Sequence, residues 1–290
     1  MANLGVFVDR QTLGNAEQLT SLIRMRDTAE GMGHEVYFIF PVDIKKIAKL
    51  DALFIRSRTD PMNISFVASK LAEYAGIPVI DDSLSIQICS DKINMYQHLM
   101  KHGVPIPATA FLTRSDIKGE VIQGLFDEMG APLVIKEPST SFSMRVEKAD
   151  TVPGFLRVAK RFIKLSDWIV VQKYVESQFD WRIGILNGEL LYACKYIIPS
   201  ETFKIQATIN GHIVYCAVKS VPCSQVPAPI VNVALQAGHA IGRGLYGVDI
   251  KEKNGDIYVI EVNDNPSLES GEDEHYPQIY EKIIRFLLKS

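Results

Sequence analysis

The chain has 290 residues, of which 47% are hydrophobic and 22% charged, a composition typical of a globular protein with two or three subdomains. Its formal net charge of −3 excludes a broad electrostatic attraction to nucleic acid or to an anionic membrane. The four cysteines form no C-x-x-C pair and no run of 18 apolar residues occurs, so we expect a cytoplasmic protein with reduced thiols and no membrane span.

The first ninety residues alternate short apolar strands with helices that carry apolar residues at helical spacing. Strands are expected at residues 4–8, 35–40, 52–55 and 77–80. Helices are expected at residues 64–75 and 16–31, the latter ending in the stop signal Gly31-Met32-Gly33. This alternation is typical of an α/β domain with a mainly parallel sheet. The first strand is not followed by G-x-G-x-x-G, which disfavours a dinucleotide-dependent oxidoreductase.

The rest of the chain changes to an α+β pattern. Asp91 and Gly103 bound an expected helix at residues 92–101, and the prolines of 104–107 keep the following connector extended. Asn-Gly pairs at 187–188 and 210–211 predict two hairpins. The other elements expected here are strands at residues 132–136, 168–175, 181–186, 189–197, 204–209, 212–218, 245–250 and 257–262, and helices at 154–162, 229–241 and 277–288.

The last hairpin carries two acids and an amide whose faces depend on the length of its turn. With a three-residue loop and Gly255 in the left-handed conformation, Asp249 lies opposite Val259. Asp249, Glu261 and Asn263 then project from one face. A two-residue loop would place Asp249 on the other face. We prefer the first register because it leaves an apolar set together for a core, namely Val248, Ile250, Ile260 and Val262.

Two carboxylates and an amide oxygen on a rigid sheet suit a hard divalent cation. Mg²⁺ is usually held by one or two carboxylates, with phosphate oxygens and water as its other ligands. The set is too sparse for a calcium cage and has no soft ligand for zinc. The alternative is that the segment from Glu261 to Pro266 is only a strand that runs into a turn.

Two lysines are placed where they could meet such phosphates. Lys92 begins a predicted helix and Lys136 ends the apolar strand P-L-V-I-K, although either could be a solvated surface lysine. The segment 138–143 is rich in hydroxyl groups. It could cover a triphosphate, or it could be an ordinary surface loop.

Seven short motifs, in this order, resemble those of ATP-grasp enzymes. They are S-D-K, V-P-I-P-A-T, P-L-V-I-K-E-P, V-V-Q-K-Y-V, F-D-W-R-I-G-I-L-N-G, L-Y-G-V-D-I and V-I-E-V-N-D-N-P. The chain is most similar to RimK-type carboxylate–amine ligases, and D-A-L-F-I-R, V-I-D-D-S-L-S-I, A-C-K-Y and G-E-D suggest the branch called RimK-family proteins. The resemblance implies an ATP-grasp fold (residues 91–175 and 176–290) after a Rossmann-like pre-ATP-grasp domain (residues 1–90).

The resemblance also implies residue roles in binding ATP and Mg²⁺, with two ions and Mn²⁺ as a substitute. The phosphates are expected to contact Lys92, Lys136, Ser139 and Ser141. The hinge strand that holds adenine is expected to comprise Gln172, Lys173, Tyr174 and Val175. The ribose or a site-organising role falls to Asp180, for which Glu176 is the alternative. The metal ligands are expected to be Asp249, Glu261 and Asn263.

Residues near the acyl phosphate and the acceptor are implied to be Arg182, Lys195 and Asn265, and Arg56 is expected to bind substrate. The implied reaction joins a carboxylate to an amine through an acyl phosphate and releases ADP and phosphate. The amine belongs to glutamate, another amino acid, a peptide or a protein terminus. Homo-oligomers are common in the family.

Two departures from the family pattern leave alternatives open. Residues 139–143 contain no glycine, whereas the family's phosphate loop usually does. A non-catalytic ATP-binding regulatory protein is therefore one alternative. Residues 204–220 lack the family's stretch of arginine, asparagine and paired glycines, so acceptor specificity cannot be transferred. A thiol or small-molecule acceptor is the other alternative.

Overall fold

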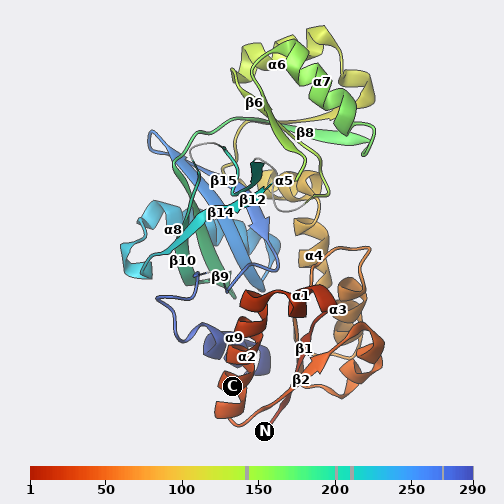
Figure 1. Ribbon diagram of the computed structural model, residues 1–290, viewed down its shortest axis with the longest axis vertical. Helices are drawn as coiled ribbons and strands as arrows, with labels where there is room; N and C mark the ends of the chain where they lie inside the picture. The colour runs from red at the N-terminus through yellow and green to blue at the C-terminus, as the bar shows by residue number, and fades with distance from the viewer. Residues whose placement is uncertain (141–143, 200–201, 210–211, 270, 290) are drawn as a thin grey trace.

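The computed structural model describes residues 1–140, 144–199, 202–209, 212–269 and 271–289. The molecule is elongated, with a sheet at each end and a larger one between them (Figure 1). The fold is mixed α/β and α+β, as predicted. In the part of the chain with described positions, no helix combines the length and apolar character needed to cross a membrane.

The N-terminal sheet is parallel and has the strand order β2-β1-β3-β4. Its strands are β1 (Asn3–Phe7), β2 (Glu35–Ile39), β3 (Ala52–Ile55) and β4 (Val79–Ile80). The predicted helices are confirmed as α2 (Ala16–Gly31) and α3 (Ile64–Tyr74). Three short helices escaped prediction: α1 (Arg10–Gly14), η1 (Pro41–Lys49) and α4 (Ser83–Cys89). Asp9 and Asp82 cap α1 and α4, which are too short for a periodic pattern to reveal.

A second, antiparallel sheet forms the opposite end of the molecule, with strand order β5-β8-β6-β7. Its strands are β5 (Thr109–Thr113), β6 (Leu133–Lys136), β7 (Val146–Ala149) and β8 (Trp168–Lys173). The helices that pack with it are α6 (Gly119–Met129) and α7 (Val152–Phe162), after the short η2 (Arg114–Asp116). Of these elements, β5, β7, η2 and α6 were not predicted.

The central sheet is antiparallel and has the order β13-β10-β9-β14-β15. Its strands are β9 (Phe179–Leu186), β10 (Glu189–Ile197), β13 (Ala217–Ser220), β14 (Leu245–Lys253) and β15 (Asp256–Asn263). One face is apolar and packs on α5 (Lys92–Lys101) and α8 (Ala228–Ile241). Two strands, β11 (Gln206–Ile209) and β12 (His212–Tyr215), pair separately, and η3 (Cys223–Gln225) precedes α8. The predicted turn at Asn210–Gly211 lies outside the described residues.

The turn of the last hairpin corrects the predicted register. Asn254 and Gly255, with φ of 56° and 89°, form a two-residue turn that pairs Lys253 with Asp256, so the predicted three-residue loop is wrong. A β-bulge then inserts Ile260 between the pairs Ile250–Val259 and Asp249–Glu261. One extra residue reverses the alternation of faces. Asp249 and Glu261 therefore do share a face, while Val259 takes the core position predicted for Ile260.

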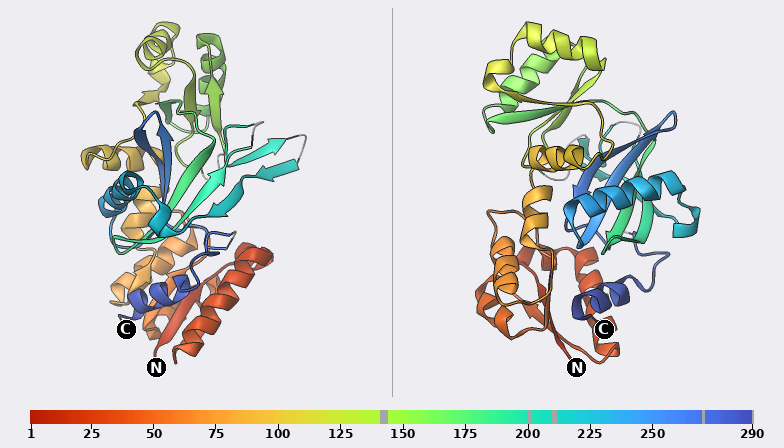
Figure 2. Two further views of the ribbon diagram at one scale, coloured as in Figure 1. Left: turned by 90° about the vertical axis from the view of Figure 1, so that its left-hand side faces the viewer. Right: turned by 180° about the vertical axis from the view of Figure 1, so that it is seen from behind.

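The C-terminal helix α9 (Ile279–Leu288) packs far from its neighbours in sequence. It lies beside α2 at the N-terminal end of the molecule (Figures 1 and 2). Ile283 and Leu287 of α9 share one apolar core with Leu4, Leu22 and Met25. This packing anchors the loop that follows β15 against the N-terminal sheet.

Candidate active site

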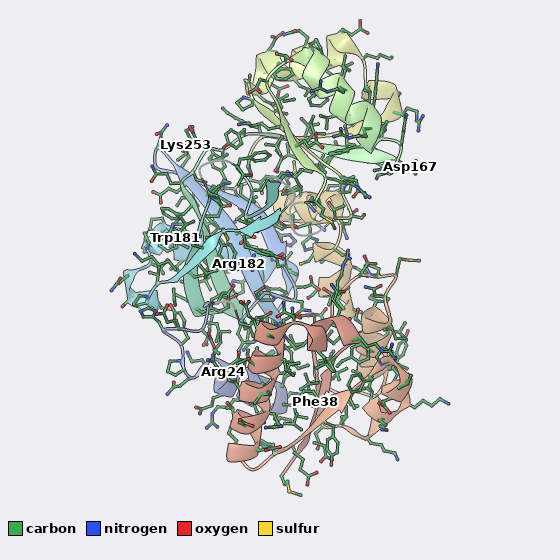
Figure 3. The ribbon with its side chains drawn as sticks, in the orientation of Figure 1. Arg24, Phe38, Asp167, Trp181, Arg182 and Lys253 are labelled. Carbon is green, nitrogen blue, oxygen red and sulfur yellow. The ribbon has the colours of Figure 1, made fainter. Side chains whose placement is uncertain are left out.

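The polar face of the central sheet brings most of the predicted site residues together. Antiparallel pairing places Asp249 on β14 between Arg182 on β9 and Glu261 on β15. Asp180 lies two residues before Arg182 on β9 and Asn263 two residues after Glu261 on β15, so both project from the same face. Figure 3 shows Arg182 on this sheet, between the two ends of the molecule.

Arg182 and Asp249 form a buried, bidentate ion pair. Arg182 Nε lies 2.5 Å from Asp249 Oδ1, and its Nη2 lies 2.9 Å from Oδ2. Burial raises the pKa of Asp249, although the charge and hydrogen bonds of Arg182 oppose that rise. Gly247 makes room for this pair, because a Cβ there would lie 2.7 Å from Pro266 Cβ and 3.0 Å from Arg182 Cδ.

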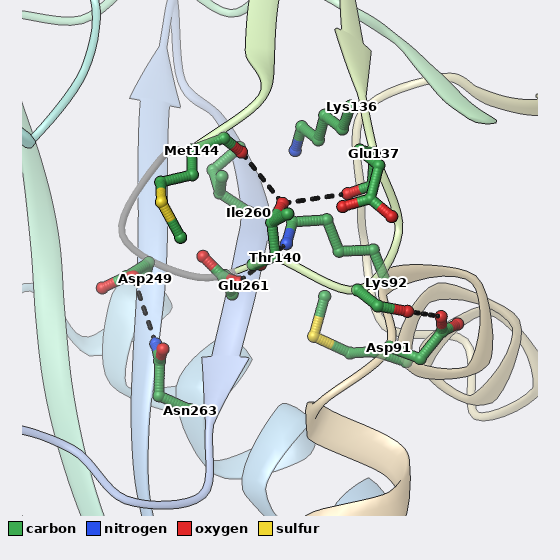
Figure 4. A network of polar contacts seen from close by, with 12 residues as sticks. Asp91, Lys92, Lys136, Glu137, Thr140, Met144, Asp249, Ile260, Glu261 and Asn263 are labelled. Carbon is green, nitrogen blue, oxygen red and sulfur yellow. Dashed lines mark hydrogen bonds and ion pairs between the residues drawn. The ribbon is translucent and has the colours of Figure 1, made fainter. Parts of the chain in front are cut away.

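Asp249, Glu261 and Asn263 offer oxygen atoms of the kind that Mg²⁺ prefers. Asn263 Nδ2 donates to Asp249 Oδ2 at 3.3 Å and to Gly247 O at 3.2 Å, which leaves its amide oxygen as an acceptor (Figure 4). Within the described ranges, no three residues of the types His, Cys, Asp and Glu gather into a metal site. Two carboxylates and one amide fit an ion that takes its other ligands from phosphate and water.

The two predicted phosphate-binding lysines both lie beside Glu261 (Figure 4). Lys92 Nζ donates to Thr140 O and lies 3.6 Å from Glu261 Oε1. Asp91 caps its helix through the N–H groups of Ile93 and Asn94. Burial lowers the pKa of Lys136 to about 7, although the Glu261 carboxylate opposes that shift. Both side chains are buried, which excludes the surface-lysine alternative.

Tyr96 is a site residue that the sequence analysis missed. Its hydroxyl accepts a hydrogen bond from Lys136 Nζ at 2.7 Å. The same oxygen lies 2.6 Å from Ile260 O and 3.2 Å from Gln172 Oε1. Tyr96 follows Lys92 by four residues and therefore shares its helix face, a signal that was available in the sequence.

The predicted hinge strand links two sheets. Lys173 N donates to Ala108 O at 2.9 Å and Tyr174 N donates to Pro132 O at 3.3 Å, after which the ladder with β6 ends. The Tyr174 ring meets the Phe203 ring edge-on at 5.9 Å. Val175 is buried just beyond the ladder.

Asp180 is buried at the start of β9, which follows this hinge, while the alternative Glu176 is exposed. Asp180 is buried and is paired with Lys251, which the sequence analysis also missed. Glu176 is exposed and forms a 3.2 Å ion pair with Lys253. Burial and position favour Asp180 over Glu176.

Arg56 and Asn265 meet where the N-terminal sheet faces the loop after β15. Arg56 Nη1 donates to Asn265 Oδ1 at 2.6 Å and to Pro266 O at 3.0 Å. Its Nη2 lies 3.1 Å from Glu269 Oε2. Asn265 Nδ2 returns a hydrogen bond of 2.7 Å to Ser57 O. In this arrangement Arg56 ties the loop that follows β15 to the first sheet.

The structure does not bring Lys195 to this group. Lys195 pairs with Trp181 on the opposite face, where its Nζ lies 4.0 Å from the Phe179 ring centre and 4.5 Å from that of Trp181. Strand alternation decides this, since Lys195 is one residue out of phase with Tyr196. Ser139 Oγ donates to Asp91 Oδ2 at 2.9 Å. Ser141 lies outside the described residues.

Comparison with known proteins identifies this arrangement. A model of the RimK-like ATP-grasp domain matches residues 89–287. The chain belongs to the RimK-like ATP-grasp family. It is thus an ATP-dependent carboxylate–amine ligase, as the motif order predicted.

Relatives of this RimK-like chain match it over nearly its whole length. A probable alpha-L-glutamate ligase 1 of Shewanella denitrificans is 27% identical over 96% of both chains. A probable alpha-L-glutamate ligase 2 of Pseudoalteromonas atlantica is 25% identical over 96% of this chain and 94% of its own.

Solved structures show the same fold at lower identity. The D-alanine–D-alanine ligase of Bacillus anthracis is similar with a TM-score of 0.74 and 20% identity, covering 100% of this chain and 97% of its own. That ligase has also been solved in complex with ATP, with a TM-score of 0.72. A RimK domain protein from Sphaerobacter thermophilus is similar with a TM-score of 0.72 and 17% identity, covering 99% and 100%.

Proposed function

We propose that this ligase activates the carboxylate of one substrate with ATP and transfers the acyl group to the α-amine of an amino acid, with glutamate as the first candidate. The observation that carries the proposal is the convergence of three basic and two acidic side chains at the polar face of the central sheet. The basic residues are Lys92, Lys136 and Arg182, and the acidic ones are Asp249 and Glu261.

In this proposal the lysines contact the phosphates of ATP and the acids bind its metal ion. Lys92 and Lys136 are buried and close to Glu261, so their charges are available to phosphate oxygens in a region that water screens poorly. Asp249, Glu261 and Asn263 would hold Mg²⁺, with two ions as the expected number. Bound magnesium supplies charge neutralisation and in-line orientation of the γ-phosphate. Val175 and Lys173 would meet adenine through their backbone groups.

Arg182 is placed to stabilise the oxygens of the acyl phosphate. Asp249 engages its Nε and Nη2, which leaves Nη1 for a substrate oxygen. The ion pair also fixes the guanidinium before any substrate arrives. A preorganised donor of this kind stabilises charge that develops in a transition state. Arg56 and Asn265 would hold the substrate from the side of the N-terminal sheet.

The relatives' names support an amino acid as the acceptor, since both relatives described above are called alpha-L-glutamate ligases. The test is to supply the purified protein with Mg²⁺ and ATP together with single amino acids and small carboxylates. ADP would be measured by a coupled assay and the products by mass spectrometry. We expect ADP only with a correct pair of substrates, and a product heavier by one amino acid residue.

Two results would contradict parts of this proposal. A thioester or other non-amide product would show that the acceptor is not an amine. ATP binding without ADP formation, across the full panel and with a cell extract as substrate source, would favour a non-catalytic ATP-binding protein. The variant Glu261→Gln serves as the inactive control.

A further inference from the structure

Lys251 is a buried lysine in the candidate nucleotide site that no motif had indicated. It follows Asp249 by two residues on β14 and therefore projects from the same face of the sheet. Its Nζ donates to Asp180 Oδ1 and, at 2.6 Å, to Ser177 Oγ. Lysine is rarely buried unless it is paired, and here a single carboxylate and a hydroxyl hold it.

The neighbouring lysine on the same strand shows that this burial is local. Lys253 lies two residues further along β14 and pairs with Glu176 at 3.2 Å. The side chains of that pair are 43% and 73% exposed, whereas those of Lys251 and Asp180 are 10% and 9% exposed. The two lysines therefore differ in their surroundings and not in strand, face or charge.

The two oxygens of the Asp180 carboxylate differ, because Oδ1 accepts the hydrogen bonds and Oδ2 is left for a ligand. Ser177 Oγ donates to Oδ1 at 3.0 Å, and Lys251 Nζ donates to the same oxygen. None of the residues with described positions donates a hydrogen bond to Oδ2. Oδ2 is also not one of the fully enclosed polar atoms that lack a partner. A carboxylate fixed in this way presents a free oxygen in one direction.

Lys251 also shares its surroundings with the phosphate-binding part of the site. Burial is the main cause that lowers the pKa of Lys136, and the charges of Lys92 and Lys251 act in the same direction. Lys251 thus lies within electrostatic reach of Lys136. Along the chain, its partner Asp180 follows the predicted hinge at residues 173–175, and Lys251 itself follows the predicted metal ligand Asp249 by two residues. The sugar of a nucleotide that reaches from the hinge to the metal ligands would lie near this pair.

We propose that Lys251 is a positioning residue for the nucleotide's sugar, which it serves by fixing Asp180 so that Oδ2 accepts hydrogen bonds from the ribose hydroxyls. The inference rests on the proposed binding of ATP at this face. Without Lys251, Asp180 would be a buried carboxylate with one hydrogen-bond donor and no directly paired cation, since Lys136 acts on it only through longer-range charge. It would then no longer present Oδ2 in a fixed direction.

The test compares binding of ATP with binding of 2′,3′-dideoxy-ATP, both with Mg²⁺, by titration calorimetry. We expect the unmodified protein to bind ATP about tenfold or more tightly than the dideoxy analogue, since the lost hydrogen bonds go to a charged group. Asp180→Asn and Lys251→Met should each bring this ratio to within about threefold of unity. The double variant should change it no further, because the two residues act as a unit.

Controls separate positioning from a merely structural effect. Lys253→Met removes a lysine from the same strand and should leave the ratio unchanged. Lys251→Arg should restore part of the ratio, and Lys251→Gln replaces the methionine variant if thermal unfolding shows that the latter does not fold. Equal weakening of ATP and dideoxy-ATP in the Lys251 variants would overturn the inference while leaving the proposed function intact. Failure of the unmodified protein to bind either nucleotide would overturn both.

Discussion

Two groups of buried carboxylates in this molecule differ in whether a basic side chain pairs with them. On the central sheet, Asp249 and Asp180 each hold a basic side chain, namely Arg182 and Lys251. Where the N-terminal sheet meets the loop after β15, Asp81 and Asp264 are buried as well. There, both oxygens of Asp81 and Oδ2 of Asp264 find no hydrogen-bond donor in the described parts of the chain.

The pKa values follow this difference. Burial raises the pKa of Asp81 well above its ordinary range and that of Asp264 to about 7. Burial also raises the pKa of Asp249, but Arg182 opposes it with both charge and hydrogen bonds. On the sheet, a basic partner thus offsets part of the effect of burial on Asp249, whereas at the junction Asp81 has no hydrogen-bond donor among the described residues and favours its neutral form. Variants of the two regions should therefore have opposite effects.

The largest effect should come from the sheet acid that lies nearest both lysines. Glu261→Gln removes a charge from the proposed metal site, and we expect turnover to fall by about a thousandfold. The free energy of unfolding should change little. The matched control is Glu252→Gln, an exposed residue of the same hairpin. Retention of more than a tenth of the activity by Glu261→Gln would remove this residue from the site.

Breaking the pair on the sheet should cost stability. Arg182→Met leaves Asp249 buried without its counter-charge, so we expect the free energy of unfolding in urea to fall by about 3 kcal/mol. Adding Asp249→Asn should restore part of that loss. The control Arg161→Met disrupts an exposed pair with Glu147 and should cost less than about 1 kcal/mol. Equal losses in both arginine variants would show that the buried pair of Arg182 and Asp249 contributes no more stability than an exposed pair.

Lys136 should make the affinity for ATP depend on pH. With a pKa of about 7 in the free protein, Lys136 loses its proton as the pH rises above 7, while bound phosphate favours the charged form. ATP affinity should therefore fall above pH 7, by up to about tenfold per pH unit, and binding at pH 8 should take up a proton. Calorimetry in two buffers of different ionisation enthalpy measures that uptake. Lys136→Gln should abolish it, and uptake that persists in this variant would assign the proton elsewhere.

The smallest effect is expected at the junction, where the substitution should reduce a loss of stability instead of causing one. The folded-state pKa of Asp81 is raised, so its contribution to stability is complete below the ordinary value of 3.8 and is lost as the pH rises above it. Asp81→Asn should therefore lose less stability than the unmodified protein between pH 5 and pH 7.5, measured by urea unfolding. A steeper loss in the variant would mean that the Asp81 carboxylate is stabilised by a partner.

Local patterns were enough for most of the longer elements and for the family, although α6, β5 and β7 were missed. The helix at residues 16–31 is observed with the predicted bounds, because an N-cap and a glycine stop are properties of the segment itself. The hinge, both lysines and the metal-binding set were named from short motifs. The assignment of their roles and the division at residues 90 and 175 stay predictions.

Contacts between distant segments could not be read in the same way. Lys195 was placed in the site by its motif, yet strand pairing turns it to the opposite face. The bulge at Ile260 has no sequence signature, although it decides whether Asp249 and Glu261 meet. Tyr96 and Lys251 were overlooked because a tyrosine in a helix and a lysine in a strand look ordinary until their partners are known.

By itself, the sequence determined most of the helices and strands, which family the chain belongs to, and which ionisable residues are candidates for chemistry. Capping, periodicity and turn residues act over a few positions, so a linear chain displays them. Only the tertiary structure decided which candidates share a face, which acids receive a counter-charge, and that the C-terminal helix returns to the first sheet. Those outcomes depend on strand register and on burial, which arise when segments far apart in the chain pack together.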